Sequence, residues 1–250
     1  VGPEVFALMR QAGILERRGD LFASALRVST LDGMLFLHSA FPTIARDSVF
    51  FGPDSYRFAS FIREALNGVN GIRRAADIGA GTGIGGIVTA KLFPDAEIVV
   101  TDINPRALRL APINAAFTHV YVDPVRSSAL DAAKGTFDLI IANPPYIADE
   151  EKRAYRDGGG MIGGQVSLDW TRAALARLAP GGRFLLYTGS AIVGGEDQLG
   201  AALRAEAEQA GCTITIREID PDVFGDELAR EAYRDVERIA LIGAVIMKPS

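Results

Sequence analysis

The sequence predicts an α/β protein, with an open and mostly parallel sheet, helices on both faces, and a small α+β appendage at the N-terminus. First, short apolar runs alternate with helical patterns between residues 75 and 190. Second, the run at 75–78 enters a glycine-rich turn, and the run at 97–101 ends in Asp102. Third, the apolar run at 139–142 stops abruptly at Asn143. Because open α/β sheets bind ligands beyond the carboxyl ends of their strands, these three ends predict one shared site.

Composition sets the class of protein. The chain has 250 residues, 48% hydrophobic and 23% charged, which suits one large globular domain plus a small appendage. It contains no apolar run of about 20 residues and no basic leader, so we expect neither a membrane span nor a secretory signal, and a cytoplasmic location. The first residue is Val1, which indicates a processed or trimmed chain. Cys212 is the single cysteine, so a disulfide framework or cysteine metal cluster is excluded. The net charge of -5 argues against a broad phosphate-binding surface.

The N-terminal residues predict a separate small unit. Residues 3–15 show helical apolar spacing that breaks at 17–20, and Asp32-Gly33 lies between two strand-like runs, which is a hairpin signal. We therefore assign residues 1–48 to a small α+β domain and residues 49–250 to the main domain. At their junction, Asp54 and Ser55 predict the cap of a helix over 56–66.

The glycine-rich turn is the strongest signal in the first half of the main domain. Gly81, Gly83 and Gly86 form a literal Gly-x-Gly-x-x-Gly pattern, which alone permits a dinucleotide site. Asp77 precedes the turn, however, and its carboxylate suits an amino group and would repel a pyrophosphate. Asp102 ends the next strand and is placed to accept both ribose hydroxyls, or alternatively to cap the following helix. Nucleotide-dependent dehydrogenases share this acidic strand end, so Asp102 does not decide for or against a dinucleotide site.

The stretch Asn143-Pro144-Pro145-Tyr146 places hydrogen-bonding groups and an aromatic ring at the end of the 139–142 strand. Asn143 offers a side-chain carbonyl, the two prolines hold the chain extended without donating hydrogen bonds, and Tyr146 offers a flat ring. The alternative is a plain strand exit with a proline stop.

This stretch resembles the motif of class I methyltransferases that use S-adenosylmethionine to methylate an amide or exocyclic amine nitrogen, the group that includes the small-domain and release-factor glutamine methyltransferases. The resemblance covers roughly residues 50–189 and implies a Rossmann-like seven-stranded sheet with its last strand inserted antiparallel. It implies a cofactor site formed by Asp77, Gly79, Gly81, Thr82, Gly83, Asp102, Ile103, Ser128 and Asn143. It also implies catalysis by Asn143, Pro144 and Tyr146, and substrate binding by Pro145 and Tyr146. Many relatives place an acid near Ser128 to bind the adenine amine; here Asp131 lies farther along.

The remaining elements follow in order. We expect a strand over 119–125, a solvated charged stretch over 149–156, and a glycine-rich loop over 157–164. In the relatives this loop shapes the substrate entrance; the alternative is a flexible surface loop. Ser167 is expected to cap a helix that ends near Leu178, with Trp170 in the core.

The C-terminal third is expected to complete the sheet. Residues 183–187 predict a fifth strand and residues 196–210 a helix. Two final strands over 213–219 and 238–247 predict a terminal hairpin. The acidic stretch 220–237 between them is expected to be a lid or a partner surface.

The predicted chemistry is transfer of a methyl group to nitrogen without a metal. If the Asn143 side-chain oxygen and the Pro144 carbonyl accept two N–H bonds, the nitrogen lone pair turns toward the methyl group. Tyr146 would hold a planar acceptor by stacking. Protein glutamine, a base amine of RNA or DNA, and a small-molecule amine all suit the motif, so a macromolecular partner, protein or RNA, is expected and a membrane is not. A non-catalytic S-adenosylmethionine-binding or assembly protein is the alternative of a different class.

Overall fold

The computed structural model describes residues 1–43, 45–149, 153 and 155–250, and its centre is one twisted sheet. The strand order is β11-β12-β9-β8-β5-β6-β7, with the short β10 (Glu196–Asp197) pairing beside β9. The other strands are β5 (Arg74–Ile78), β6 (Glu97–Asp102), β7 (Asp123–Arg126), β8 (Phe137–Ala142), β9 (Leu178–Val193), β11 (Thr213–Asp220) and β12 (Arg238–Met247). Neighbours from β9 to β7 pair in parallel, whereas β12 runs antiparallel between β9 and β11. The predicted sheet, with its inserted antiparallel strand, is confirmed.

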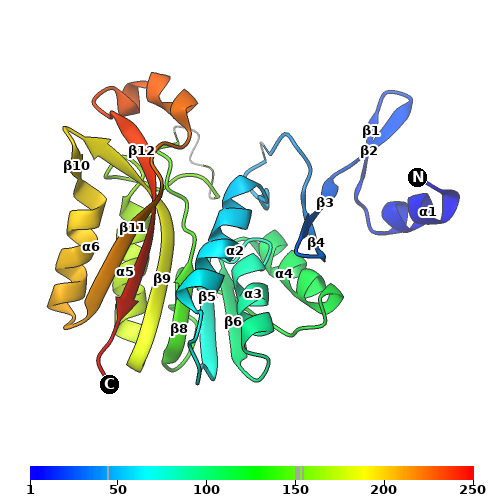
Figure 1. The fold of residues 1–250 in the computed structure, drawn as a ribbon. Helices are drawn as coiled ribbons and strands as arrows, with labels where there is room; N and C mark the ends of the chain where they lie inside the picture. Colours follow the sequence, from blue (N-terminus) through cyan, green and yellow to red (C-terminus); the bar gives the residue numbers. More distant parts are fainter. Residues whose placement is uncertain (44, 150–152, 154) are drawn as a thin grey trace.

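Helices cover both faces of this sheet (Figure 1). One core cluster joins the sheet to α2 (Pro53–Ala65), α3 (Ile84–Leu92) and α4 (Pro105–Phe117); the other joins it to α5 (Gln165–Arg177) and α6 (Gln198–Gln209). Strand β8 supplies Leu139 and Ile141 to the first cluster and Ile140 and Ala142 to the second. Alternate side chains of a strand point to opposite faces, so a strand buried on both faces must be apolar throughout, as predicted.

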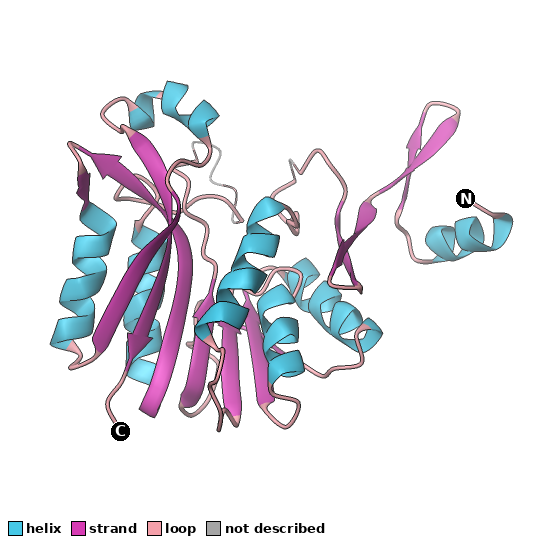
Figure 2. Cartoon of the chain, viewed as in Figure 1, coloured by secondary structure: helices cyan, strands magenta, loops and turns pink. Residues whose placement is uncertain are grey.

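The N-terminal elements fall into two parts (Figure 2). Helix α1 (Pro3–Gln11), which has no buried residue, and the hairpin of β1 (Leu15–Arg18) and β2 (Leu21–Ser24) project away from the sheet. The hairpin of β3 (Leu26–Leu31) and β4 (Met34–Ser39) turns at Asp32-Gly33, both at positive φ, as the Asp-Gly signal predicted. It packs on α4, where the Asn114 side chain accepts from Leu37 N at 2.8 Å and donates to Leu37 O at 3.1 Å. A domain boundary near residue 48 stays a prediction.

Several element boundaries differ from the sequence prediction for local reasons. Strand β7 begins at Asp123 because His119 occupies a left-handed conformation that ends the α4 turn. Helix α5 begins two residues before Ser167, so Ser167 does not cap it; the Ser167 hydroxyl lies 2.7 Å from the Thr188 hydroxyl inside the core. The β1–β2 hairpin was also missed. The break at 17–20, which was expected to end a helix, consists of the last two residues of β1 and the Gly19-Asp20 turn.

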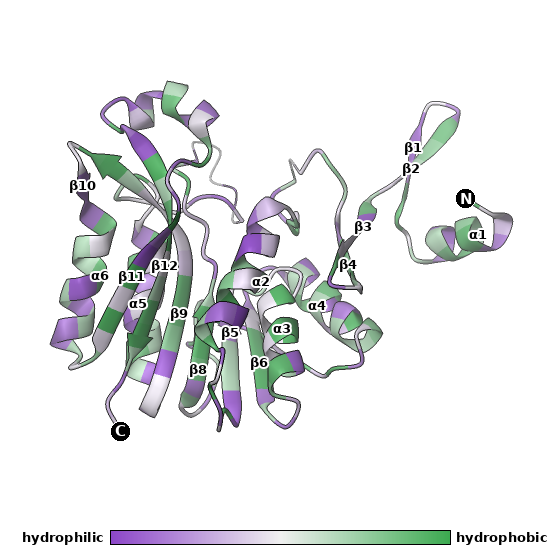
Figure 3. Ribbon diagram, viewed as in Figure 1, coloured by the Kyte–Doolittle hydropathy of each residue, from purple (hydrophilic) through white to green (hydrophobic). Residues whose placement is uncertain are grey.

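Hydropathy follows the layers (Figure 3). The strands are green through the centre of the sheet, and purple residues gather on the outer helices and on the segment between β11 and β12. Within the described residues, no helix is long and apolar enough to cross a membrane.

Candidate functional site

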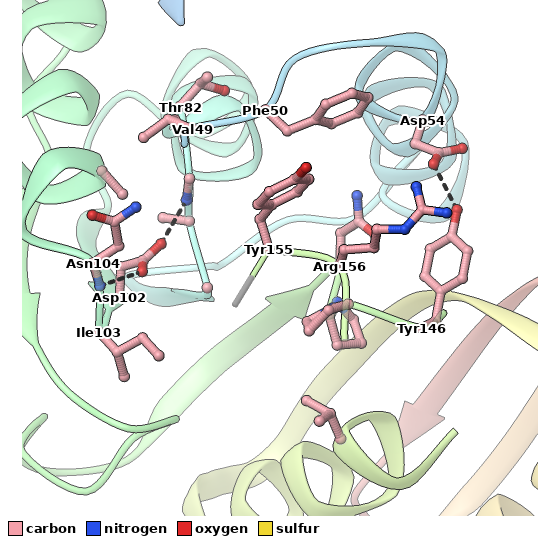
Figure 4. Close-up of a pocket in the computed structure, with 18 of the residues that line it drawn as sticks. Val49, Phe50, Asp54, Thr82, Asp102, Ile103, Asn104, Tyr146, Tyr155 and Arg156 are labelled. Carbon is pink, nitrogen blue, oxygen red and sulfur yellow. Dashed lines mark hydrogen bonds between the residues drawn. The ribbon is translucent and has the colours of Figure 1, made fainter. Parts of the chain in front are cut away.

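A cavity of about 440 Å³ opens at the carboxyl ends of β5, β6 and β8. Every site residue predicted from the sequence lines it except Gly83. Three strand ends that are far apart in the sequence therefore meet at one place, as the topology requires. Figure 4 shows Asp102, Ile103 and Asn104 on one side of this cavity and Tyr146, Arg156 and Asp54 on the other.

The glycine turn forms the floor of the first side. Gly79, Gly81 and Gly83 all have positive φ, which side-chain-bearing residues rarely adopt. A Cβ on Gly81 would meet nothing nearer than the Gly79 carbonyl oxygen at 4.0 Å, so the backbone there is open to the cavity. A Cβ on Gly83 would lie 2.8 Å from the Ala111 Cβ, so Gly83 is required for packing of α3 against α4. Gly83 therefore has a packing role and does not line the cavity; its place in the cofactor site stays a prediction.

Asp77 lies beneath the turn and is almost fully buried, with 2% of its surface exposed. Its Oδ2 accepts a hydrogen bond from Gly86 N at 2.7 Å, in the first turn of α3. Burial raises the pKa of Asp77 to about 7, although the Gly86 N–H opposes the shift. Asp77 is therefore a carboxyl group that borders the cavity and changes its charge near neutral pH.

Asp102 links the turn to the next strand end. Its two oxygens accept from Gly81 N at 3.0 Å and from Asn104 N at 2.8 Å (Figure 4). Burial raises the pKa of Asp102, and the backbone N–H groups of Asn104, Gly81 and Ile103 lower it. Each carboxylate oxygen has a further lone pair, so these bonds leave room for a ligand hydroxyl. Asn104 itself caps α4 by accepting from Arg106 N at 2.9 Å.

Asn143 is half-buried at the end of β8 and lines the cavity. Within the described residues, its side chain makes no hydrogen bond. Pro144 is buried beside it. Among the described residues, no hydrogen bond fixes the orientation of the Asn143 carboxamide. The donor and acceptor atoms of Asn143 are therefore available to whatever occupies the cavity.

Tyr146 is held on several sides and is 7% exposed. Its hydroxyl donates to Asp54 Oδ2 at 2.6 Å. A Cβ on Gly189 would come within 2.4 Å of the ring, and the Phe224 ring packs edge-on at a centroid distance of 5.9 Å. Burial first, and then the Asp54 charge, raise the pKa of Tyr146 well above its usual value. Asp54 was expected to be a helix cap, but Gly52 and Ser55 form the cap and Asp54 turns toward the tyrosine.

The glycine-rich loop after the motif is packed against it. A Cβ on Gly158 would lie 1.8 Å from the Gly163 carbonyl oxygen and 2.7 Å from the Tyr146 Cα. Ile147 N donates to Arg156 O at 3.0 Å, and Gly158 N donates to Ile147 O at 2.8 Å. The alternative of a flexible surface loop is wrong, because these glycines are required by close backbone approach.

The charged stretch 149–156 is not simply solvated. Positions 150–152 and 154 lie outside the described residues, but Asp149 is buried and accepts from Arg153 Nε at 2.9 Å. These Arg153 hydrogen bonds lower the pKa of Asp149 to about 2. Arg156 pairs with Asp149 at 3.5 Å and with Glu227. Of the described residues in this stretch, Tyr155 and Arg156 line the cavity, and Arg156 is held there by its ion pairs.

The segment 220–237 also borders the cavity. From the sequence it was expected to be a lid or a partner surface. It holds two short 3-10 helices, η1 (Gly225–Ala229) and η2 (Glu231–Tyr233). Phe224 lines the cavity, and the Tyr233 hydroxyl accepts from Ala148 N at 2.7 Å.

Three aromatic side chains also line the cavity. Trp170 packs against the core cluster from α5, as expected, and it also reaches the cavity, where a Cβ on Gly79 would come within 2.3 Å of its ring. Phe50 and Tyr155 line the cavity with nearly parallel rings, 6.3 Å apart between centroids (Figure 4). Tyr155 was expected only within a solvated charged stretch, because a single aromatic in a loop carries no periodic signal.

Comparisons with known proteins match this geometry. A release factor glutamine methyltransferase from Deinococcus radiodurans is 35% identical over 172 residues, which is 64% of this chain and 58% of that protein. Another from Koribacter versatilis is 33% identical over 129 residues, 46% of each chain. The 16S rRNA N2 G1207 methyltransferase of T. thermophilus, solved with AdoMet and guanosine, shares the fold with a TM-score of 0.59 and 17% identity, over 95% of this chain and 58% of that one.

The chain spans about half the length of the curated relatives that it matches. The family model of the methyltransferase small domain matches residues 59–188, from helix α2 through strand β9. That range contains the glycine turn, both acidic strand positions and the whole motif at the end of β8. The chain therefore belongs to the methyltransferase small domain family.

Proposed function

We propose that this protein is an S-adenosylmethionine-dependent N-methyltransferase whose acceptor is the side-chain amide of a protein glutamine. One observation carries the proposal: the Asn143 carboxamide, which makes no hydrogen bond within the described residues, borders the same cavity as the open Gly81 backbone and the Asp102 carboxylate. A cofactor position and a group able to bind an amide thus adjoin. The glutamine methyltransferase names of the relatives support this acceptor class.

The residues on the first side of the cavity fit S-adenosylmethionine. The Gly81 backbone, open to the cavity, allows close approach of the methionine part, and the Asp77 carboxylate would attract its ammonium group. Asp102 would accept the ribose hydroxyls through lone pairs that its backbone bonds leave free. Ser128 and Ile103 line the cavity near Asp102 and would border the adenine.

The residues on the second side would prepare the acceptor nitrogen. When bound, S-adenosylmethionine supplies a methyl group attached to a sulfonium, and this sulfur is a good leaving group. An amide nitrogen is a weak nucleophile because its lone pair is delocalised into the carbonyl. If the Asn143 oxygen and the Pro144 carbonyl accept both N–H bonds, they hold the lone pair toward the methyl group and stabilise the positive charge that develops on nitrogen.

Charge favours a polypeptide acceptor over a nucleic acid. Seven acidic residues and two arginines lie between 220 and 237, so this segment accounts for the whole net charge of -5. Its Phe224 lines the cavity beside Tyr146, so a macromolecule that reaches the motif passes this acidic segment. Phosphates would be repelled there, whereas a neutral or basic polypeptide would not.

The test is transfer of labelled methyl from S-adenosylmethionine to separated protein, RNA and DNA fractions from a strain that lacks this protein. We expect label in protein, and recovery of methylglutamine after proteolysis. Label in RNA that is sensitive to RNase would replace glutamine by a base amine. Calorimetry gives the control: S-adenosylmethionine should bind with micromolar affinity, about -8 kcal/mol, and NAD should not bind.

A further inference from the structure

We propose that Asp54 is a positioning residue that fixes the Tyr146 ring and, through it, the acceptor-binding end of the motif. The inference rests on the proposed function, because it concerns how Asn143-Pro144-Pro145-Tyr146 is held for transfer. No sequence signal joins the two residues, which are 92 positions apart.

The contact geometry gives Asp54 one clear task. Asp54 is 9% exposed and lies in the first turn of α2, where its Oδ2 accepts from the Tyr146 hydroxyl at 2.6 Å. Its Oδ1 accepts from the Tyr187 hydroxyl at 3.1 Å and lies 3.9 Å from Arg57 Nη1. A short bond from a phenol to a buried carboxylate is charge-assisted and directional, so it fixes the rotation of the ring. Figure 4 shows this bond crossing from α2 to the motif.

The bond acts on the motif because the backbone between Tyr146 and Asn143 is stiff. Pro144 and Pro145 each have a fixed φ, so the position of Tyr146 is transmitted to the Pro144 carbonyl and to Asn143. The same loop that precedes Asp54 lines the cavity with Val49 and Phe50. Asp54 thereby joins the loop that borders the cofactor side to the motif that borders the acceptor side.

Tyr187 provides a matched control in the same network. It donates to the same carboxylate, but it lies in β9, is fully buried in the core, and does not line the cavity. Removal of either hydroxyl deletes one bond to Asp54 and leaves an aromatic ring of nearly the same size. The two substitutions therefore differ in whether the deleted bond reaches the motif.

The experiment is a double-mutant cycle with the labelled methyl assay, using the acceptor fraction that the wild-type protein modifies. Tyr146→Phe and Asp54→Ala should each lower kcat by about tenfold, as loss of one charged hydrogen bond predicts. The double variant should lose no more than either single one, and Asp54→Asn, which retains one acceptor oxygen, should recover most of the rate. Tyr187→Phe should keep kcat, and the affinity for S-adenosylhomocysteine should change little in all variants. Additive losses in the double variant, or equal losses in Tyr187→Phe, would overturn the positioning role.

A second measurement needs no acceptor and no Asp54 variant, so it stands even if Asp54→Ala fails to fold. The amides of Ile147 and Ala148 are bonded to Arg156 O at 3.0 Å and to the Tyr233 hydroxyl at 2.7 Å, so hydrogen exchange reports on the motif. We expect faster exchange at these two amides in Tyr146→Phe and unchanged exchange in Tyr187→Phe. Unchanged exchange in both refutes the inference, whereas absence of methyl transfer by the wild-type protein refutes the proposed function.

Discussion

The buried carboxyl group of Asp77 gives a prediction that combines stability, pH and ligand binding. The folded protein keeps this proton up to about pH 7, whereas an unfolded chain loses it near the ordinary value of 3.8. The folded state therefore binds more protons between these values, and its stability falls as pH rises from about 4 toward 7. Between pH 5 and pH 8 this single group should lower the unfolding free energy by about 3 kcal/mol.

The substitution Asp77→Asn isolates this contribution. The asparagine side chain cannot ionise, and its oxygen can still accept the hydrogen bond from Gly86 N, which lies 2.7 Å from the native Oδ2. Asp149, with its pKa of about 2, stays ionised between pH 5 and pH 8 in both proteins and does not contribute to the difference. Urea unfolding at pH 5 and pH 8 should show that the wild type loses about 3 kcal/mol of unfolding free energy relative to Asp77→Asn. Equal losses in the two proteins would refute the assignment of a raised pKa to Asp77.

Cofactor binding should also depend on the ionisation of Asp77. S-adenosylmethionine carries two positive charges, which favour ionised Asp77, so its affinity should rise between pH 6 and pH 8. Near pH 7 binding should release a fraction of a proton, because Asp77 is then only partly ionised in the free protein. Calorimetry in two buffers of different ionisation enthalpy measures this release. A proton release that persists in Asp77→Asn would place the linked group elsewhere.

Three further substitutions test the remaining parts of the site. Asn143→Ala should lower turnover by at least about a hundredfold while cofactor affinity stays near wild type, as for loss of an oxyanion-hole donor; near-normal turnover would remove Asn143 from the mechanism. Asp102→Ala should weaken S-adenosylmethionine binding by about 1.5–3 kcal/mol in calorimetry; unchanged affinity would leave Asp102 with only its bonds to the Gly81 and Asn104 amides. Gly158→Ala would place a Cβ 1.8 Å from the Gly163 carbonyl oxygen and should cost about 1–3 kcal/mol of stability, whereas Gly160→Ala, whose Cβ meets only a side chain at 3.8 Å, should be tolerated in thermal melts.

The cofactor side of the cavity was predictable because each of its parts is local in sequence. A strand, a glycine turn and a helix form one continuous unit around Asp77, and the next strand ends in Asp102. Parallel order then brings the two ends together with Asn143, so strand ends alone locate the cavity. Gly83 belongs to the same turn but does not line the cavity, and it packs against Ala111, which lies in another helix. Its place in the cofactor site stays a prediction.

The acceptor side was less predictable because its walls come from long-range contacts. Asp54 was interpreted as a cap because Asp is common at helix starts, and its bond to Tyr146 crosses 92 residues. Asp149 was expected in solvent because its neighbours are charged, yet Arg153 and Arg156 neutralise it in the interior. Phe224 lies in the segment 220–237, which was expected to be a lid or a partner surface, but no hydrophobic periodicity singled out Phe224 as a residue that lines the cavity.

This difference in locality explains why the chemistry is easier to infer than the acceptor. The atoms proposed to bind the cofactor are backbone groups and strand-end carboxylates, which a short motif specifies completely. The atoms proposed to choose the acceptor are side chains on three separate segments, represented by Phe50, Tyr155 and Phe224, and they meet only after the whole sheet has formed. Substitutions on those segments can change the acceptor without touching the motif. The family match over residues 59–188 therefore supports the proposed class of reaction more directly than the proposed acceptor, since Phe50 and Phe224 both lie outside that range.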